Sequence, residues 1–272
     1  MELLDYDFMR RALIAAAIVG VTAPLVGVFL VQRRLALLGD GMGHVALTGV
    51  GLAFLTGLAP IPMALIVAAL GAIVLELIRY RSRTAGDVAL ALIFYGGIAG
   101  GVFLTSLASG KASTALNQYL FGSLSTVSTE DLYALAVAAA GIVAILLIFG
   151  RQLFTLSLDS DLAHTQGLRV VRLSMLLTVL AAVAVVVGMR TVGLLLVSAI
   201  MIVPIAAAQQ VTRSFSSTTV IGLVIGVVSA ILGLVAAFYL DVPPGPTIVF
   251  LALGAFIVLA TGGWLARGRH AG

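Results

Sequence analysis

The sequence predicts an all-α membrane protein, a polytopic bundle of eight or nine transmembrane helices. Of its 272 residues, 61% are hydrophobic and only 10% are charged, and the mean hydropathy is +1.21. A soluble domain contains about 25% charged residues and about half apolar ones, so a chain of this length has more apolar surface than a soluble core can bury. This composition excludes a soluble enzyme, a disordered chain and a nucleic-acid-binding domain.

The apolar residues are gathered into stretches long enough to cross a bilayer, which requires about 20 mostly apolar residues per helix. Nine stretches qualify: Ala12–Val31, Leu35–Gly57, Ile61–Ile78, Val88–Leu107, Leu132–Gly150, Leu173–Met189, Thr191–Val211, Thr218–Leu240 and Ile248–Ala266. Only Arg190 separates the sixth stretch from the seventh, so these two could instead form one broken or re-entrant unit, leaving eight crossings. No stretch remains for a soluble domain, and residues 1–272 are expected to form a single transmembrane domain.

The cationic residues predict the orientation of the chain. With nine spans, one side of the membrane holds 11 of the 15 lysines and arginines and the other side holds four. The four are Arg10, Arg11, Lys111 and Arg190. Cytoplasmic loops carry an excess of such residues, so we expect the N-terminus outside and the C-terminus in the cytoplasm. The cations are scattered, which is a weak electrostatic footprint for nucleic acid.

Asp40 and His44 form the candidate metal site. Their i, i+4 spacing places both side chains on one helix face, and an ionisable residue at membrane depth is costly enough to indicate function. Carboxylate and imidazole suit zinc, and also manganese or iron. Two ligands are too few for a tetrahedral site, but a homodimer with this face on its axis would supply four. Thr48 continues the face and is a candidate supporting residue; the alternative is an Asp–His hydrogen bond with a purely structural role.

The remaining charges within the apolar stretches have simpler interpretations. Glu76 lies close to Arg79 and is expected to form an ion pair that reaches toward the membrane surface. Asp87 opens the fourth stretch, where a carboxylate suits the positive end of a helix. The chain lacks the G-x-x-x-x-G-K-[ST] pattern of a nucleotide-binding P-loop, so we expect it to hydrolyse no ATP itself.

Several segments along nearly the whole chain carry a family resemblance. They are APLVGVFLVQRRLALLGDGMGHVALTGVGLAF, GDVALALIFYGGIAGGVFL, LNQYLFGSLSTVSTEDL, GLRVVRL and RTVGLLLVSAIMIVPIAAAQQV. In order and spacing they resemble the membrane permease subunit of the zinc/manganese/iron family of ABC importers. The G-D-x-x-x-H element around Asp40 and His44 is the most specific part. The one departure is Gly43, where many relatives have serine.

The resemblance implies an ATP-driven import system in a bacterial plasma membrane. The permease would be a homodimer in lipid, with two cytoplasmic ABC ATPase subunits and an extracytoplasmic metal-binding protein. It would hold no permanent cofactor and would pass on a transported metal ion. Zinc is preferred because two Asp and two His suit tetrahedral coordination; manganese or iron is the alternative. A secondary transporter without an ATPase is a further alternative, although no internal inverted repeat is visible.

A cytoplasmic segment at about 155–172 is the candidate coupling segment. Asp159 or Ser160 can cap a short helix and Gly167 is a natural stop. In the family, the corresponding helix docks into the ATPase; by itself the pattern also fits an ordinary surface helix. The residues expected to couple are Asp159, Asp161, Leu162, Ala163, His164 and Gly167.

On the opposite side, Lys111–Asp131 is predicted to form a short amphipathic helix. It could contribute to an outer gate or to the docking surface for the binding protein. Anchoring at the membrane interface through Tyr119 and Phe121 is the alternative.

Overall fold

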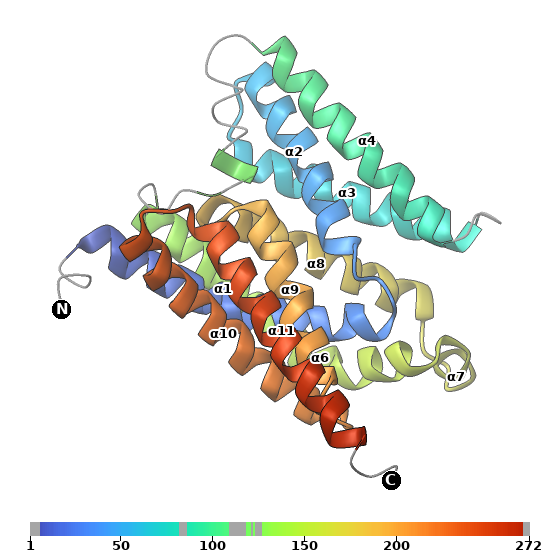
Figure 1. Ribbon diagram of the computed structural model, residues 1–272. Coiled ribbons are helices and arrows are strands. Elements are labelled where there is room, and N and C mark those ends of the chain that lie inside the picture. Colours follow the sequence, from blue (N-terminus) through green and yellow to red (C-terminus); the bar gives the residue numbers. More distant parts are fainter. Residues whose placement is uncertain (1–5, 82–85, 109–117, 121, 123–126, 269–272) are drawn as a thin grey trace.

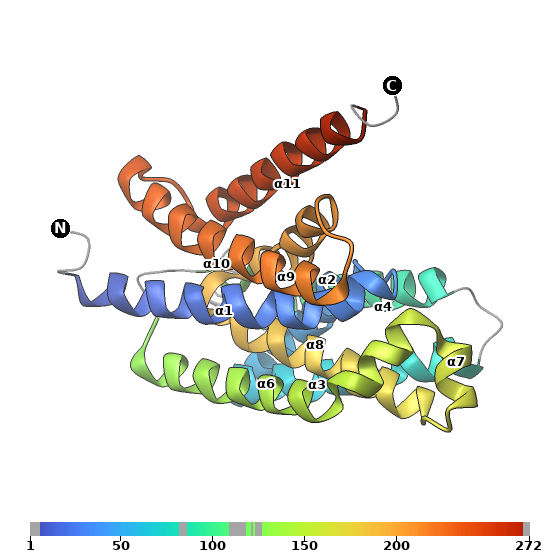
Figure 2. The same cartoon turned by 90° about the horizontal axis from the view of Figure 1, so that it is seen from below.

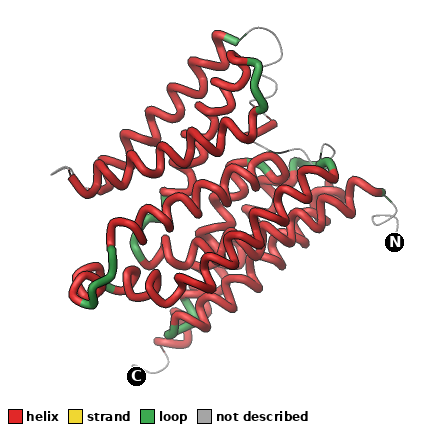
Figure 3. Tube along the Cα trace, turned by 180° about the vertical axis from the view of Figure 1, so that it is seen from behind, coloured by secondary structure: helices red, strands yellow, loops and turns green. Residues whose placement is uncertain are grey.

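The protein is a bundle of helices (Figures 1 and 3). The computed structural model describes residues 6–81, 86–108, 118–120, 122 and 127–268. Its helices are α1 (Asp7–Gln32), α2 (Leu38–Thr56), α3 (Pro60–Arg81), α4 (Gly86–Leu107), α6 (Thr129–Leu158), α7 (Ser160–Thr165), α8 (Val170–Val192), α9 (Leu194–Gln209), α10 (Phe215–Leu240) and α11 (Pro244–Gly268).

Eight of these helices are long and apolar enough to cross a membrane, and α9 is the shorter apolar helix. Its 16 residues extend over about 24 Å, whereas a bilayer core is about 30 Å thick. By length the structure therefore favours eight full crossings among the described residues. Figures 1 and 2 nevertheless show α9 running back along the bundle between α8 and α10, so successive helices still alternate in direction.

The short helix α9 lies inside the bundle, in contact with α1, α2, α8, α10 and α11. Its buried residues extend from Leu194 near the start to Ala208 near the end. A helix so covered by protein does not need the full length of a lipid-exposed span. A second group, α2, α3 and α4, packs together, and α8 joins it to the rest through contacts with both α2 and α3 (Figure 1).

Small residues allow the closest helix contacts in this bundle. A Cβ atom at Gly226 of α10 would lie 2.7 Å from the carbonyl oxygen of Gly20 on α1. One at Gly222 would overlap the side chain of Ile205 on α9. The Gly222/Gly226 pair therefore packs α10 against two neighbouring helices.

The helix α6 is longer than the predicted span Leu132–Gly150. It begins after Ser128, whose hydroxyl accepts a hydrogen bond from the Asp131 amide while the Asp131 carboxylate accepts one from the Ser128 amide. It continues through Leu158, giving 30 residues and a length of about 45 Å. The predicted outer helix Lys111–Asp131 falls mostly outside the described residues, and its last three residues belong to α6.

Candidate metal site and coupling segment

Asp40 and His44 lie at the start of α2, one turn apart. Their side chains are 28% and 14% exposed, and His44 Nε2 lies 3.9 Å from Asp40 Oδ1. This separation is longer than a hydrogen bond. The structure therefore does not support the purely structural Asp–His hydrogen bond, and it leaves both groups able to bind a ligand.

Two residues from other helices complete the immediate surroundings. Ser198 Oγ on α9 lies 3.4 Å from Asp40 Oδ1 and 3.0 Å from the Leu194 carbonyl oxygen. The ring of Phe94 on α4 stands edge-on to the His44 imidazole, with centroids 4.9 Å apart and an interplanar angle of 79°. The serine supplies a further oxygen beside the carboxylate, and the phenyl ring limits the orientations open to the imidazole.

A hollow of about 210 Å³ opens beside Asp40. Its lining residues are Leu37, Asp40, Asp87, Leu90, Ala91, Phe94 and Tyr95. Asp87 occupies the first turn of α4, as predicted, and it also faces this hollow. Two carboxylates thus border one space, which makes the hollow attractive to a cation.

Close packing between α2 and α4 fixes the position of the site. A Cβ atom at Gly97 would lie 2.7 Å from the carbonyl carbon of His44, so only glycine allows this approach. Thr48 lies on the same contact, where its hydroxyl donates a hydrogen bond of 2.9 Å to the Gly97 carbonyl oxygen. Thr48 therefore joins α2 to α4.

A single copy of the chain supplies few metal donors. Among the residues that the structure describes, no group of three or more His, Asp or Glu side chains gathers in a metal-binding arrangement. Asp40 and His44 are one carboxylate and one imidazole. A complete coordination sphere would need donors from elsewhere, such as water or a second copy.

No pattern in the sequence marks Ser198 or Phe94 as part of this site. Serine and phenylalanine are ordinary residues in apolar helices, and their importance comes from helix packing between segments 50 or more residues apart. Asp87 did carry a signal, since it is one of few charges next to an apolar stretch. Its position at a helix start suggested capping, and only the packing of α4 against α2 shows that it also faces the hollow.

The coupling segment forms the short helix α7 with the predicted caps. Asp159 Oδ1 accepts hydrogen bonds from the amides of Asp161 and Leu162, at 2.8 and 3.2 Å. At the other end, Gly167 has φ +76°, and the Leu168 amide bonds to the Ala163 carbonyl at 3.0 Å. This is the glycine-terminated pattern of a helix end. Residues 155–158 of the predicted segment belong to α6, and 170–172 belong to α8.

The two faces of α7 differ in exposure. Ala163 is fully buried, so its side chain packs α7 onto the rest of the bundle. Asp161, Leu162 and His164 are exposed. A groove of about 620 Å³ runs beside them, lined by Tyr80, Ser160, Asp161, His164, Leu168, Arg169, Val170, Val171 and Arg172.

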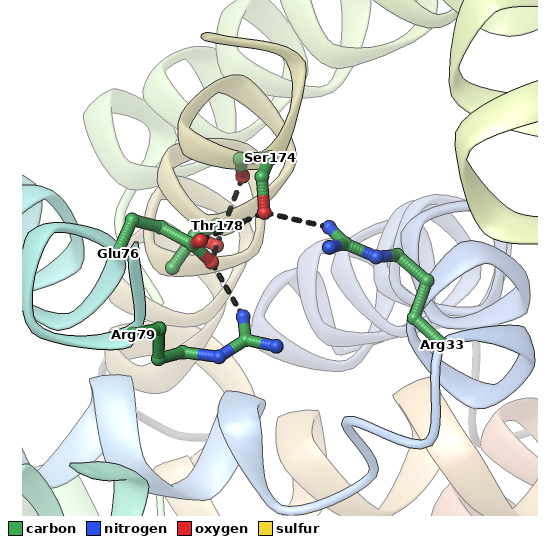
Figure 4. Close-up of polar contacts among 5 residues, drawn as sticks. All are labelled: Arg33, Glu76, Arg79, Ser174 and Thr178. Carbon is green, nitrogen blue, oxygen red and sulfur yellow. Dashed lines mark hydrogen bonds and ion pairs between the residues drawn. The ribbon is translucent and has the colours of Figure 1, made fainter. Parts of the chain in front are cut away.

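The predicted ion pair between Glu76 and Arg79 is present, with Arg79 Nη1 2.8 Å from Glu76 Oε1. The expectation that Glu76 reaches toward the membrane surface is wrong, because the residue is only 5% exposed. Its carboxylate points into the bundle, where hydroxyl groups of Ser174 and Thr178 on α8 donate to it (Figure 4). Internal hydrogen bonds replace the water that a surface position would provide.

The eight long apolar helices define a multi-pass membrane protein, and comparison with known proteins gives the family. Residues 5–262 match the ABC 3 transport family, so the chain belongs to that family. It is a permease subunit of a metal ABC importer.

Relatives and a solved structure match nearly the whole chain. A probable metal transport system membrane protein of Treponema pallidum is 32% identical over 94% of this chain and 95% of its own length. The manganese transport system membrane protein MntC of Listeria monocytogenes is 30% identical, over 94% and 91%. The structure of PsaBC from Streptococcus pneumoniae in complex with Fab is 32% identical with a TM-score of 0.84, covering 94% of this chain and 92% of that one.

Proposed function

We propose that two copies of this chain form the membrane path for a divalent transition metal ion, with Asp40 and His44 of each copy as its transient ligands. The observation that carries this proposal is the open Asp40–His44 pair, whose nearest atoms are 3.9 Å apart. One copy offers only one carboxylate and one imidazole, and a two-fold axis through this face would double the set. Ligands shared between copies also suit transport, because an ion must be released as well as bound.

Manganese is the cargo that we propose, in place of the zinc favoured by ligand number alone. The Listeria relative is named as a manganese transport protein. The site also offers oxygen donors from Asp40 and Ser198, and manganese accepts oxygen ligands more readily than zinc does. Zinc is the competing outcome of the test below.

The ATP-driven mechanism needs partners. ATPase subunits would dock on the side where α7 lies, and a metal-binding protein would deliver the ion on the other side. Four arginines lie at or near the α7 end of the bundle: Arg33, Arg79, Arg169 and Arg172. This is the distribution of a cytoplasmic face, and it supports an N-terminus outside and a C-terminus inside.

The test is metal uptake by proteoliposomes that contain this chain and its ATPase. We expect ATP-dependent uptake of manganese, and its loss in Asp40→Asn and His44→Ala variants that still assemble with the ATPase. Asp241→Asn is the matched control, because Asp241 is an exposed carboxylate at the end of α10 and should leave uptake unchanged.

Two results would overturn parts of this proposal. Normal uptake by both site variants would remove Asp40 and His44 from the path. Uptake without ATP or an ATPase would indicate a secondary transporter. Competition between zinc and manganese in the same vesicles identifies the transported metal. The metal that inhibits uptake of the other at the lower concentration is the preferred substrate.

A further inference from the structure

Five residues, three buried and two half-buried, form a polar cluster at the junction of three helices, the Glu76 cluster. It consists of Arg33, Glu76, Arg79, Ser174 and Thr178 (Figure 4). Glu76 Oε1 accepts hydrogen bonds from Arg79 and Thr178, and Oε2 accepts one from Ser174, each at 2.8 Å. The Ser174 hydroxyl in turn accepts a bond of 2.7 Å from Arg33 Nη1. The chain of bonds ties the ends of α1, α3 and α8 together.

Packing three helices around charged groups costs desolvation free energy. Buried charges lose their hydration, and well-packed apolar residues commonly stabilise a fold as well or better. Burial lowers the pKa of the Arg33 guanidinium, and the nearby Glu76 carboxylate opposes that shift. Arginine stays protonated in proteins, so two cations and one carboxylate share this junction. Its directional bonds fix the relative position of the helices more strictly than apolar contacts would.

The cluster borders the coupling segment. A polar hollow of about 360 Å³ lies where α6 passes into α7. Its lining residues are Arg33, Arg79, Leu156, Ser157, Leu158, Asp159 and Ser160. Asp159 caps α7, and Tyr80, next to Arg79, lines the groove beside α7. Arg33, Arg79 and the cap of α7 therefore border one hollow, so a displacement of α7 changes the space around both arginines.

The cluster is also joined to the metal-binding helix by a short, hydrogen-bonded link. Arg33 is the residue that ends α1. The Leu35 amide bonds to the Leu30 carbonyl at 2.9 Å, and the Arg34 amide bonds to the Val31 carbonyl at 3.1 Å. Arg34 holds φ +59°, which completes the tight helix-ending motif.

The hydrogen-bonded link continues directly into the start of α2. The Leu38 amide bonds to the Leu35 carbonyl at 3.0 Å, and both leucines are buried. Asp40 follows two residues later, in the first turn of α2. A shift of Arg33 is thus passed through a rigid turn to the proposed metal ligand.

We propose that the Glu76 cluster is the joint that transmits movement of α7 to the metal-binding helix α2, with Glu76 and Ser174 as positioning residues. This inference rests on the proposed function, in which α7 meets an ATPase. It assigns the coupling of ATP use to metal release to the contacts among Arg33, Ser174 and Glu76.

The test compares metal transported per ATP hydrolysed in proteoliposomes that contain the permease and its ATPase. Glu76→Gln keeps the side-chain size and removes the charge. Ser174→Ala keeps the Glu76–Arg79 ion pair and removes the link to Arg33. We expect both variants to retain ATP hydrolysis and to transport about tenfold less metal per ATP. Manganese binding to the purified permease should be unchanged.

Asp131→Asn is the matched control. Asp131 is 9% exposed and pairs with Arg190 Nε at 2.9 Å, at the other end of the bundle from α7. Loss of this ion pair should lower thermal stability while the ratio of metal to ATP stays constant.

The inference is overturned if Glu76→Gln and Ser174→Ala keep the wild-type ratio. It is also overturned if they lower hydrolysis and transport in equal proportion, as a merely structural role would. Failure of the proposed function is distinguishable, because then wild-type vesicles themselves would show no ATP-dependent metal uptake.

Discussion

Gly97 on α4 packs directly against the backbone of His44 on α2, the helix that carries both proposed metal ligands. A Cβ atom at Gly97 would lie 2.6 Å from the Val45 amide nitrogen and 3.0 Å from the His44 carbonyl oxygen. Backbone atoms cannot rotate away as a flexible side chain can. The position of His44 thus depends on the absence of a side chain on a different helix.

Gly97→Ala should therefore push α2 and α4 apart. We expect a loss of about 1–3 kcal/mol of stability, the usual cost of overpacking, and weaker manganese binding. Thermal unfolding in detergent and metal titration of the purified protein measure both effects.

Gly96→Ala is the control for this substitution, because nothing lies within 4 Å of the Cβ position at Gly96. Alanine is the better helix former, so this neighbour should retain or gain stability. Equal behaviour of the two variants would contradict the role of Gly97 in the helix contact.

The fold class and the candidate ligands were predictable because each depends on local sequence. Apolar stretches of bilayer length predict the helices, and the spacing of Asp40 and His44 places them on one face. The caps of α7 were predictable for the same reason, since Asp159 and Gly167 act on their own helix ends. Local patterns identify these features without knowledge of the neighbours.

Features that depend on packing between distant segments could not be predicted. Glu76 carries the same local signal whether its carboxylate reaches solvent or, as here, bonds to Ser174 and Thr178 about 100 residues away. Gly43 faces Leu194, whose side chain fills the space of a Cβ atom. The inward orientation of Ala163 likewise follows from how α7 lies on the bundle.

Asp159→Ala should loosen the short helix α7. The substitution removes two hydrogen bonds to backbone amides, at a cost of about 1 kcal/mol. A helix of six residues cannot persist without such support. We expect faster amide hydrogen exchange at residues 161–165, measured by mass spectrometry.

Two control variants test whether faster exchange in α7 comes from loss of the Asp159 cap. Asp159→Ser keeps a capping oxygen and should restore protection of the α7 amides. Asp161→Asn changes the neighbouring carboxylate, whose side chain does not make the cap, and should exchange like the wild type. Unchanged exchange in Asp159→Ala would show that packing of Ala163 alone holds α7 in place.

Arg34→Val should destabilise the turn between α1 and α2. Arg34 has φ +59°, a left-handed conformation that β-branched residues avoid. We expect a loss of about 1–2 kcal/mol, while Arg34→Gly keeps the turn. Ala36→Val is the control, since Ala36 is exposed in the same link and is not among the positive-φ residues. If Arg34→Val and Ala36→Val lower the unfolding temperature equally, the left-handed backbone at Arg34 is not what makes valine unfavourable there.

Gly193→Ala should destabilise the break between α8 and α9. Gly193 has φ +91° and ψ 149°, a region open almost only to glycine, and forcing another residue into it costs about 1–3 kcal/mol. The break allows the buried α9 to turn back into the bundle, so the substitution strains the centre of the fold. We expect a lower unfolding temperature in detergent and a smaller yield of folded protein. Gly141→Ala is the control, because Gly141 lies inside α6 with open space at its Cβ position. If Gly193→Ala unfolds at the same temperature as Gly141→Ala, the left-handed backbone at 193 is not required for the return of α9.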